Sequence, residues 1–282
     1  MLAGEHELVL RPGDDGVALV RDRARPSAFT LRMGRTDQSY VDLDDPLRLE
    51  FDYVQRIADA LDLLGEPGGR LRIVHLGGAG MTLPRYVAAT RPRSGQVVLE
   101  PDVELTAFVR EHLPLPRQSG IKVRGVDGRA GIAELRDRYA DAVVVDAFVG
   151  AQVPAELTTA EFFAEVRRVL TPTGTLLVNV TDRGPFAYAR RVVAGVRTAF
   201  GQVLMSAEPA TLKGRRFGNV LVLASGAELP HLELARRAGG GPFPYRVLHG
   251  ERLAQLVAGG APFTDADAEM SPEPPRGSGH FS

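Results

Sequence analysis

The chain of 282 residues contains no cysteine and no tryptophan. Without cysteine it can form no disulfide, no thiolate zinc site and no cysteine nucleophile. Its histidines are scattered and show none of the close spacings, such as HExxH, that bind a catalytic metal. We therefore expect a protein that binds no metal ion.

The chain also has almost no net charge and no long apolar run. The formal net charge is −1, so the molecule as a whole attracts neither nucleic acid nor an anionic membrane. No apolar run reaches the roughly 20 residues that span a bilayer. The N-terminal stretch MLAGEHELVLRPGDDG carries acidic residues where a signal peptide has its apolar core. These absences predict a cytoplasmic protein with no nucleic-acid or membrane partner.

The pattern of apolar residues changes along the chain. Residues 6–50 hold short apolar runs, and the turn cluster PGDDG separates the first two, which is typical of β-hairpins. From residue 51, stretches with helical spacing alternate with Val/Ile/Leu-rich runs, at 71–76, 96–100, 121–126, 141–148 and 175–180. Such alternation indicates a parallel sheet buried on both faces.

The predicted fold class is therefore α/β. We expect an N-terminal β-hairpin domain at residues 1–50 and a Rossmann-like nucleoside-binding domain at 51–228 that ends in an antiparallel hairpin. A C-terminal extension at 229–282 is expected to be partly disordered, because its composition is rich in Gly, Pro and acidic residues. Within the central domain, Thr158 and Glu161 form a T-x-x-E pattern that predicts the start of a helix.

A glycine loop follows the first strand of the alternating region. Gly77, Gly78 and Gly80 would let the backbone approach a ligand closely, although glycines also serve an ordinary tight turn. Glu100 lies 20 residues after Gly80, at the end of the next strand. A carboxylate there can accept hydrogen bonds from both ribose hydroxyls, and it would also stabilise the N-terminus of the following helix.

Two further acidic residues follow strands. Asp127 and Gly128 come after the third run, in a pair that is also common in plain turns. Asp146 ends the fourth run, at the carboxyl edge where open α/β sheets bind ligands. A GxGxxG fingerprint is absent, and an acid at position 100 disfavours a 2′-phosphate. Together these positions predict a mononucleoside ligand rather than NAD or NADP.

Taken together, these segments resemble the spermidine synthases, which are polyamine aminopropyltransferases, over roughly residues 36–225. The segments that carry the resemblance are Gln38 to Tyr40, LEFDYV, LGGAG, Glu100, VDGRA, DAVVVDAF and LTTAEFF. The resemblance implies a sheet of the class I methyltransferase type. It also implies S-adenosylmethionine or decarboxylated S-adenosylmethionine as the co-substrate, and a homodimer formed through the N-terminal region.

The resemblance implies a role for each site residue. Gln38 would contact the nucleoside, Glu100 the ribose, and Asp127 with Gly128 the adenine. Asp146 corresponds to the first aspartate of the family's D-x-x-D-P motif and is the expected catalytic residue. Tyr53 corresponds to a tyrosine of the amine pocket.

The departures from the family concentrate on the amine side. Ala79 stands where the family has an aspartate that holds the aminopropyl ammonium, and Val149 replaces the second aspartate of D-x-x-D-P. Residues 211–212 replace the family's tyrosine-proline. An unpaired buried ammonium costs several kcal/mol as an order of magnitude. We therefore expect a degenerate polyamine pocket, unless Glu156 or Asp182 supplies the missing carboxylate.

Three functions follow from these observations. The first is a spermidine-synthase-like transferase that moves a methyl or aminopropyl group to an unidentified small-molecule acceptor, with true spermidine synthesis doubtful. The second is a non-catalytic nucleoside-binding or assembly protein that retains the fold. The third, an NAD-dependent oxidoreductase, is disfavoured by the glycine spacing.

Overall fold

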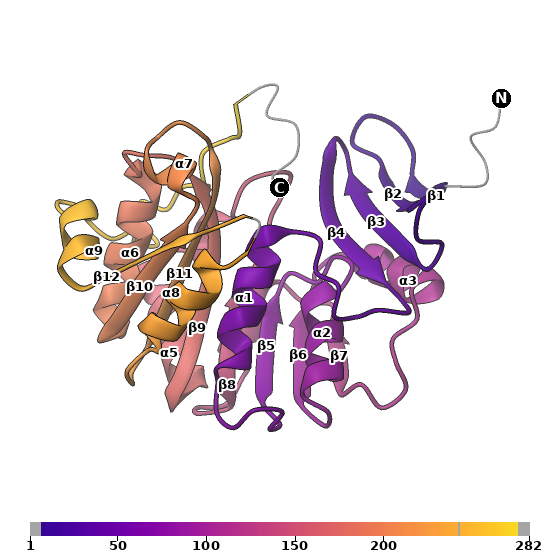
Figure 1. Cartoon of the computed structure of the whole chain (residues 1–282), viewed down its shortest axis with the longest axis horizontal. Helices are drawn as coiled ribbons and strands as arrows, with labels where there is room; N and C mark the ends of the chain where they lie inside the picture. Colours follow the sequence, from indigo (N-terminus) through magenta and orange to yellow (C-terminus); the bar gives the residue numbers. More distant parts are fainter. Residues whose placement is uncertain (1–6, 242, 276–282) are drawn as a thin grey trace.

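The computed structural model describes residues 7–241 and 243–275. These residues form a small antiparallel sheet and a large mixed sheet (Figure 1). The order of the large sheet is β12-β10-β11-β9-β8-β5-β6-β7. Its strands are β5 (Arg72–Leu76), β6 (Gly95–Leu99), β7 (Ile121–Arg124), β8 (Ala140–Val145), β9 (Leu170–Asp182), β10 (Gln202–Ala207), β11 (Gly218–Ser225) and β12 (Arg246–His249).

The first five of these strands, from β5 to β9, pair in parallel. They coincide with the apolar runs of the sequence, so the predicted parallel sheet is confirmed. β11 and β10 follow as an antiparallel hairpin, with β11 inserted between β9 and β10. This arrangement is the predicted class I methyltransferase type. β12 pairs with β10 on its other side, so β12 forms this edge of the sheet.

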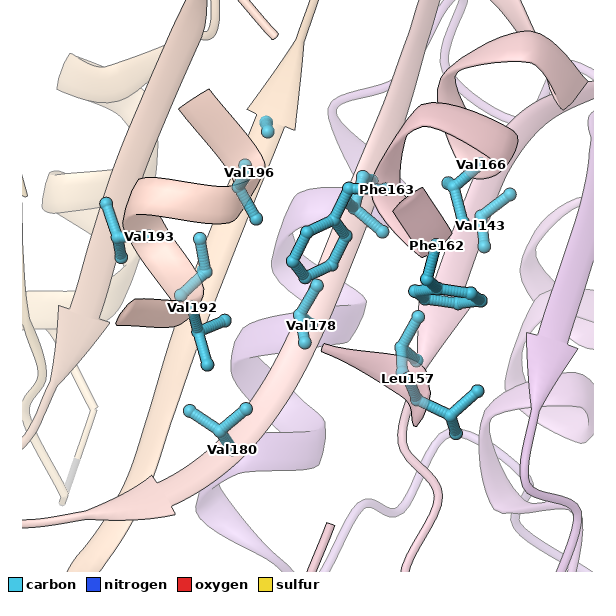
Figure 2. Packing of buried hydrophobic residues seen from close by; sticks show 14 of the residues in the cluster. Val143, Leu157, Phe162, Phe163, Val166, Val178, Val180, Val192, Val193 and Val196 are labelled. Carbon is cyan, nitrogen blue, oxygen red and sulfur yellow. The ribbon is translucent and has the colours of Figure 1, made fainter. Parts of the chain in front are cut away.

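Helices cover both faces of the large sheet. One face packs against α1 (Asp52–Asp62), α2 (Thr82–Thr90) and α8 (His231–Gly239). The other packs against α4 (Gly128–Ala133), α5 (Ala160–Val169), α6 (Ala187–Ala199) and α9 (Gly250–Leu256). Figure 2 shows part of this second layer, where Phe162 and Phe163 of α5 lie against the sheet with Val143 and Val178. The central strands are mostly apolar because both of their faces are buried, and His75, Gln96 and Asn179 are polar exceptions.

The start of α5 corrects the predicted helix cap. Thr159 caps the helix, because its hydroxyl accepts a hydrogen bond from the Phe162 backbone N–H. Thr158 was expected in this role, but its hydroxyl donates to the Ala155 carbonyl and contacts the Tyr188 hydroxyl. The Thr158 hydroxyl is therefore already bonded to the short 3-10 helix before α5, and Thr159 is the residue that caps α5.

The N-terminal sheet has the order β1-β2-β3-β4 and is entirely antiparallel. Its strands are β1 (Glu7–Arg11), β2 (Val17–Arg21), β3 (Ala28–Met33) and β4 (Thr36–Asp42). Its apolar face packs against α3 (Val103–His112), as Figure 1 shows at the β7 side of the large sheet. Arg11 also pairs with Asp102 and Glu104 beside α3, both at 2.8 Å. The small predicted β-structure is thus attached to the central region.

The C-terminal segment extends the large sheet through α8, β12 and α9. Beyond α9, the Ser271 hydroxyl accepts a hydrogen bond from the Val153 backbone N–H at 2.8 Å, and Ser271 is fully buried. Gln152 donates its side-chain amide to the Ser271 carbonyl. The expected disorder therefore does not extend to Ser271; residues 276–282 of that prediction lie outside the described residues.

Two absences hold for the described ranges. No helix there is long and apolar enough to cross a membrane. No group of three or more His, Asp or Glu residues within residues 7–241 and 243–275 is arranged to hold a metal ion. The expectation that the protein binds no metal stays a prediction.

Candidate functional site

A cavity of about 350 Å³ opens at the carboxyl ends of the parallel strands. This volume falls in the range of small-molecule sites, and the position is where open α/β sheets bind ligands. All the predicted site residues except Gly80 line it. They are Gln38, Tyr53, Gly77, Gly78, Glu100, Asp127, Gly128 and Asp146.

The glycine loop lies directly against the end of β8. Gly77 has a φ of 89°, and a Cβ added there would lie 2.3 Å from the Asp146 carbonyl oxygen. Both the backbone conformation and the lack of space require glycine at this position. The loop therefore brings its backbone against the strand that carries Asp146.

Glu100 is fixed by the backbone of this loop. Its Oε2 accepts hydrogen bonds from the N–H groups of Gly78, at 2.8 Å, and Ala79, at 3.4 Å. Its Oε1 accepts from the Asp102 N–H at 3.0 Å, just before α3. The two roles considered from the sequence, ribose binding and stabilisation of the next helix, are thus compatible. The carboxylate accepts backbone hydrogen bonds and still lines the cavity. A carboxylate has about four acceptor positions, so it retains capacity for a ligand hydroxyl.

Asp127 caps α4 and also lines the cavity. Its Oδ1 accepts a hydrogen bond from the Ala130 N–H at 2.9 Å. Gly128 is buried beneath it, and an added Cβ would lie 2.7 Å from a methyl carbon of Leu76. The Asp127–Gly128 turn therefore has the structural role that such pairs have in plain turns. It also presents a carboxylate to the cavity.

Asp146 is half-buried at the end of β8, where Asn179 of β9 orients it. The Asn179 side-chain N–H donates to Asp146 Oδ1 at 2.9 Å. Burial raises the pKa of Asp146 to about 6, although the hydrogen bond from Asn179 opposes this rise. A carboxyl that titrates near neutrality can accept a proton from a reacting group. Asn179 was not predicted, although it interrupts an otherwise apolar strand.

Tyr53 and His75 complete the wall near Asp146. Burial, with the Asp146 carboxylate nearby, raises the pKa of Tyr53 well above its usual range, so its phenol stays protonated. His75 Nε2 lies 3.0 Å from Gln96 Oε1, while the Gln96 amide donates to the Pro84 carbonyl. Burial lowers the pKa of His75 to about 4. His75, which the sequence analysis did not single out, is therefore a neutral side chain.

The N-terminal sheet supplies one side of the site through β4. Gln38 lines the cavity and donates to the Gly150 carbonyl at 3.2 Å. Ser39 accepts a hydrogen bond from the Gly80 N–H at 3.1 Å. A Cβ on Gly80 would lie 2.8 Å from that of Ser39. Gly80 therefore holds the loop against β4 rather than lining the cavity.

Of the residues that depart from the family's amine side, two line the cavity, and Thr211 and Leu212 do not. Ala79 and Val149 both line the cavity, and Val149 is 64% exposed. Of the two compensating carboxylates considered, Glu156 lines the cavity. Asp182 does not, because its two oxygens accept hydrogen bonds from the N–H groups of Arg183 and Ala189.

The chain is similar to known transferases in sequence. It is 27% identical over 172 residues to a polyamine aminopropyltransferase of Chromobacterium violaceum. That match covers 60% of this chain and 64% of the relative, so the matched part spans less than two thirds of that protein. No family model matches the chain.

Solved structures extend the likeness over most of the chain. A probable spermidine synthase from Corynebacterium glutamicum is 30% identical and superposes with a TM-score of 0.83, covering 89% of this chain and 93% of the other. Human methyltransferase-like protein 13 in complex with SAH shares the fold, with a TM-score of 0.54 and 20% identity over 76% of this chain and 96% of that one. Both likenesses support the α/β fold described above.

Proposed function

The chain belongs to the spermidine synthase family, and from this premise we propose that it transfers an alkyl group from an adenosyl sulfonium donor to a small-molecule acceptor. The donor would be S-adenosylmethionine or its decarboxylated form. The observation that carries the proposal is one cavity that joins the glycine loop, Glu100 and Asp127 to Asp146. The first three can bind a nucleoside, and Asp146 can accept the proton that is lost in the reaction.

The chemistry needs little from the protein beyond position and a base. The acceptor atom attacks the carbon attached to sulfur, a new bond to carbon forms, and the carbon–sulfur bond breaks to release a neutral thioether. Holding the acceptor in line with that bond provides much of the acceleration. Asp146 would take the proton that the acceptor loses, and Asn179 would fix the carboxylate for this task.

We favour methyl transfer over aminopropyl transfer. Both donors carry an ammonium, but in S-adenosylmethionine the donor's own carboxylate lies beside it. The decarboxylated donor lacks that carboxylate and needs an anion from the protein, and Ala79 offers none at the position of the family's aspartate. Leaving a charged group unpaired costs about 1.5–3 kcal/mol of binding for each lost charge-assisted contact. The same reasoning opposes putrescine as the acceptor, since Val149 replaces the second aspartate; it holds unless Glu156, which lines the same cavity, pairs with the second ammonium.

Calorimetry with methylthioadenosine, S-adenosylhomocysteine and the two donors tests the nucleoside site. We expect dissociation constants in the micromolar range or tighter, about −8 kcal/mol. Glu100→Ala should weaken binding by about 1–3 kcal/mol by removing the carboxylate that faces the ribose. Glu104→Ala is the matched control, since Glu104 pairs with Arg11 and is not among the cavity residues. Undetectable binding of all four ligands at millimolar concentration would refute the proposal.

Turnover separates transfer from the non-catalytic alternative. Labelled donors supplied with a panel of small amines and hydroxyl compounds should yield a labelled product and the matching thioether. The position and raised pKa of Asp146 favour catalysis, because such carboxyls concentrate at reacting sites. Tight nucleoside binding without turnover across the panel would favour the non-catalytic function.

A further inference from the structure

The cavity has an inner compartment on the side of the sheet that α1 covers. We define it by Phe51, Tyr53, Val54, His75, Val144 and Asp146, all of which line the cavity. Val54 and Val144 belong to one buried cluster, and Phe51 and Tyr53 pack against that cluster. Since alternate residues of a strand share a face, Asp146 lies on the same face as Val144. The inner compartment is therefore continuous with the nucleoside side but has its own lining.

The inner compartment carries a single negative charge. His75 is neutral and Tyr53 keeps its proton, so Asp146 is the one ionisable acid among its six residues. One carboxylate can pair with one ammonium. A second ammonium on the same ligand would rest against aliphatic and aromatic side chains, where an unpaired ion is costly.

The remainder of the inner compartment is apolar and partly flat. The rings of Phe51 and Tyr53 lie nearly parallel, at 9°, with centroids 6.2 Å apart. Val54 is 4% exposed and Val144 1%, so the two valines form the buried, apolar part of the lining. Surfaces of this kind bind a hydrocarbon body, and aromatic faces add a preference for a planar ring.

Two carboxylates lie near this compartment without lining it. Asp52 precedes Tyr53 and is 3% exposed, and Glu208 forms an ion pair with Arg216 at 3.2 Å. Neither is among the cavity residues. Arg216 pairs with Glu208, and Asp52 Oδ1 accepts a hydrogen bond from the Tyr53 N–H. Because neither carboxylate lines the cavity, the far end of a diamine bound there would not contact them.

We infer that the acceptor is a small molecule with a single amino group on an apolar, preferably aromatic, body, rather than a polyamine. This inference rests on the proposed transfer and names its substrate class. The amine nitrogen lies at Asp146 and the hydrocarbon lies against Phe51, Val54 and Val144. In the reaction the nitrogen–carbon bond forms, the carbon–sulfur bond breaks, and the proton lost by nitrogen passes to Asp146.

The test compares three amines on the protein saturated with methylthioadenosine or S-adenosylhomocysteine. Phenethylamine has one amine and a ring, propylamine has one amine and little body, and putrescine has two amines. Calorimetry should show that phenethylamine binds at least about 100-fold more tightly than putrescine and at least about tenfold more tightly than propylamine. Of the three amines, only phenethylamine has a hydrocarbon body large enough to cover the apolar side chains of the inner compartment.

Two matched valine variants sharpen the comparison. Val149→Asp adds a carboxylate at a cavity position that is 64% exposed, so the fold should tolerate it. It should tighten putrescine binding by about tenfold and leave phenethylamine nearly unchanged. Val103→Asp is the control, since Val103 is 63% exposed on α3 and does not line the cavity. It should change neither affinity.

The nucleoside titration is carried out first and alone, so its failure would refute the proposed function separately. If the nucleoside binds and putrescine binds as tightly as phenethylamine, the inference is wrong, and a second carboxylate, such as Glu156 of the same cavity or the Asp52–Glu208 cluster, pairs with the far ammonium. Nucleoside binding without measurable binding of any amine would also overturn it. A preference for phenethylamine that Val149→Asp alone reduces would support it.

Discussion

Asp146→Asn is expected to stabilise the folded protein at neutral pH while it removes transfer activity. Burial raises the pKa of Asp146 from its ordinary 3.8 to about 6. The folded state therefore resists ionisation, so the free energy of unfolding falls between about pH 4 and about pH 6 and stays lowered above. The full difference corresponds to about 3 kcal/mol, and since the half-buried carboxyl borders an open cavity we expect about 1–3 kcal/mol.

Asparagine suits this experiment because it keeps the size of the side chain and can still accept the hydrogen bond from Asn179. Urea unfolding at about pH 4 should show little difference from the unaltered protein, and at about pH 8 the variant should be more stable. Transfer should fall by about 10²–10⁴-fold through loss of the base. Asp137→Asn, at an exposed ion pair with Arg168, is the control and should show no such gain. Equal or lower stability of the Asp146 variant at about pH 8 would refute the reasoning.

Three further outcomes are expected. Asn179→Ala removes the hydrogen bond that opposes the raised pKa of Asp146, so the acidic limb of the kcat/KM profile should move above about pH 6; an unchanged limb would exclude this positioning role. Gly80→Ala places a Cβ 2.8 Å from that of Ser39 and should destabilise the protein by about 1–3 kcal/mol in thermal unfolding. A homodimer is expected in light scattering, and a monomer at micromolar concentration would contradict that expectation.

The sheet could be predicted from the sequence because its strands are buried on both faces. β5, β6 and β8 each contain a run of apolar residues, and such runs alternate with stretches of helical spacing. The cap of α5 could not be predicted to the residue. Thr158 and Thr159 are adjacent, and the choice between them depends on Tyr188, which is distant in sequence and contacts Thr158. β12 was not predicted because it has only four residues, RVLH, which are too few to show a strand pattern.

The candidate site was predictable where strand order alone determines position. Glu100, Asp127 and Asp146 follow β6, β7 and β8, which are parallel strands of one sheet, so all three lie at its carboxyl edge. Gly80 was assigned to the ligand because sequence cannot show that β4 folds over the glycine loop. Asn179 acts through a hydrogen bond between strands that are far apart in sequence, and such a contact becomes visible only in three dimensions.

The attachment of Ser271 to residues 152 and 153 has a consequence for how this site can diversify. The loop that contributes Val149 and Gly150 to the cavity is fastened by hydrogen bonds from a segment near the opposite end of the chain. A change in the length or composition of that distant segment would alter the part of the cavity that Val149 and Gly150 line, without replacing any cavity residue. Ligand preference in this architecture can therefore shift through the tail, while the strands and the glycine loop that hold the nucleoside remain the same.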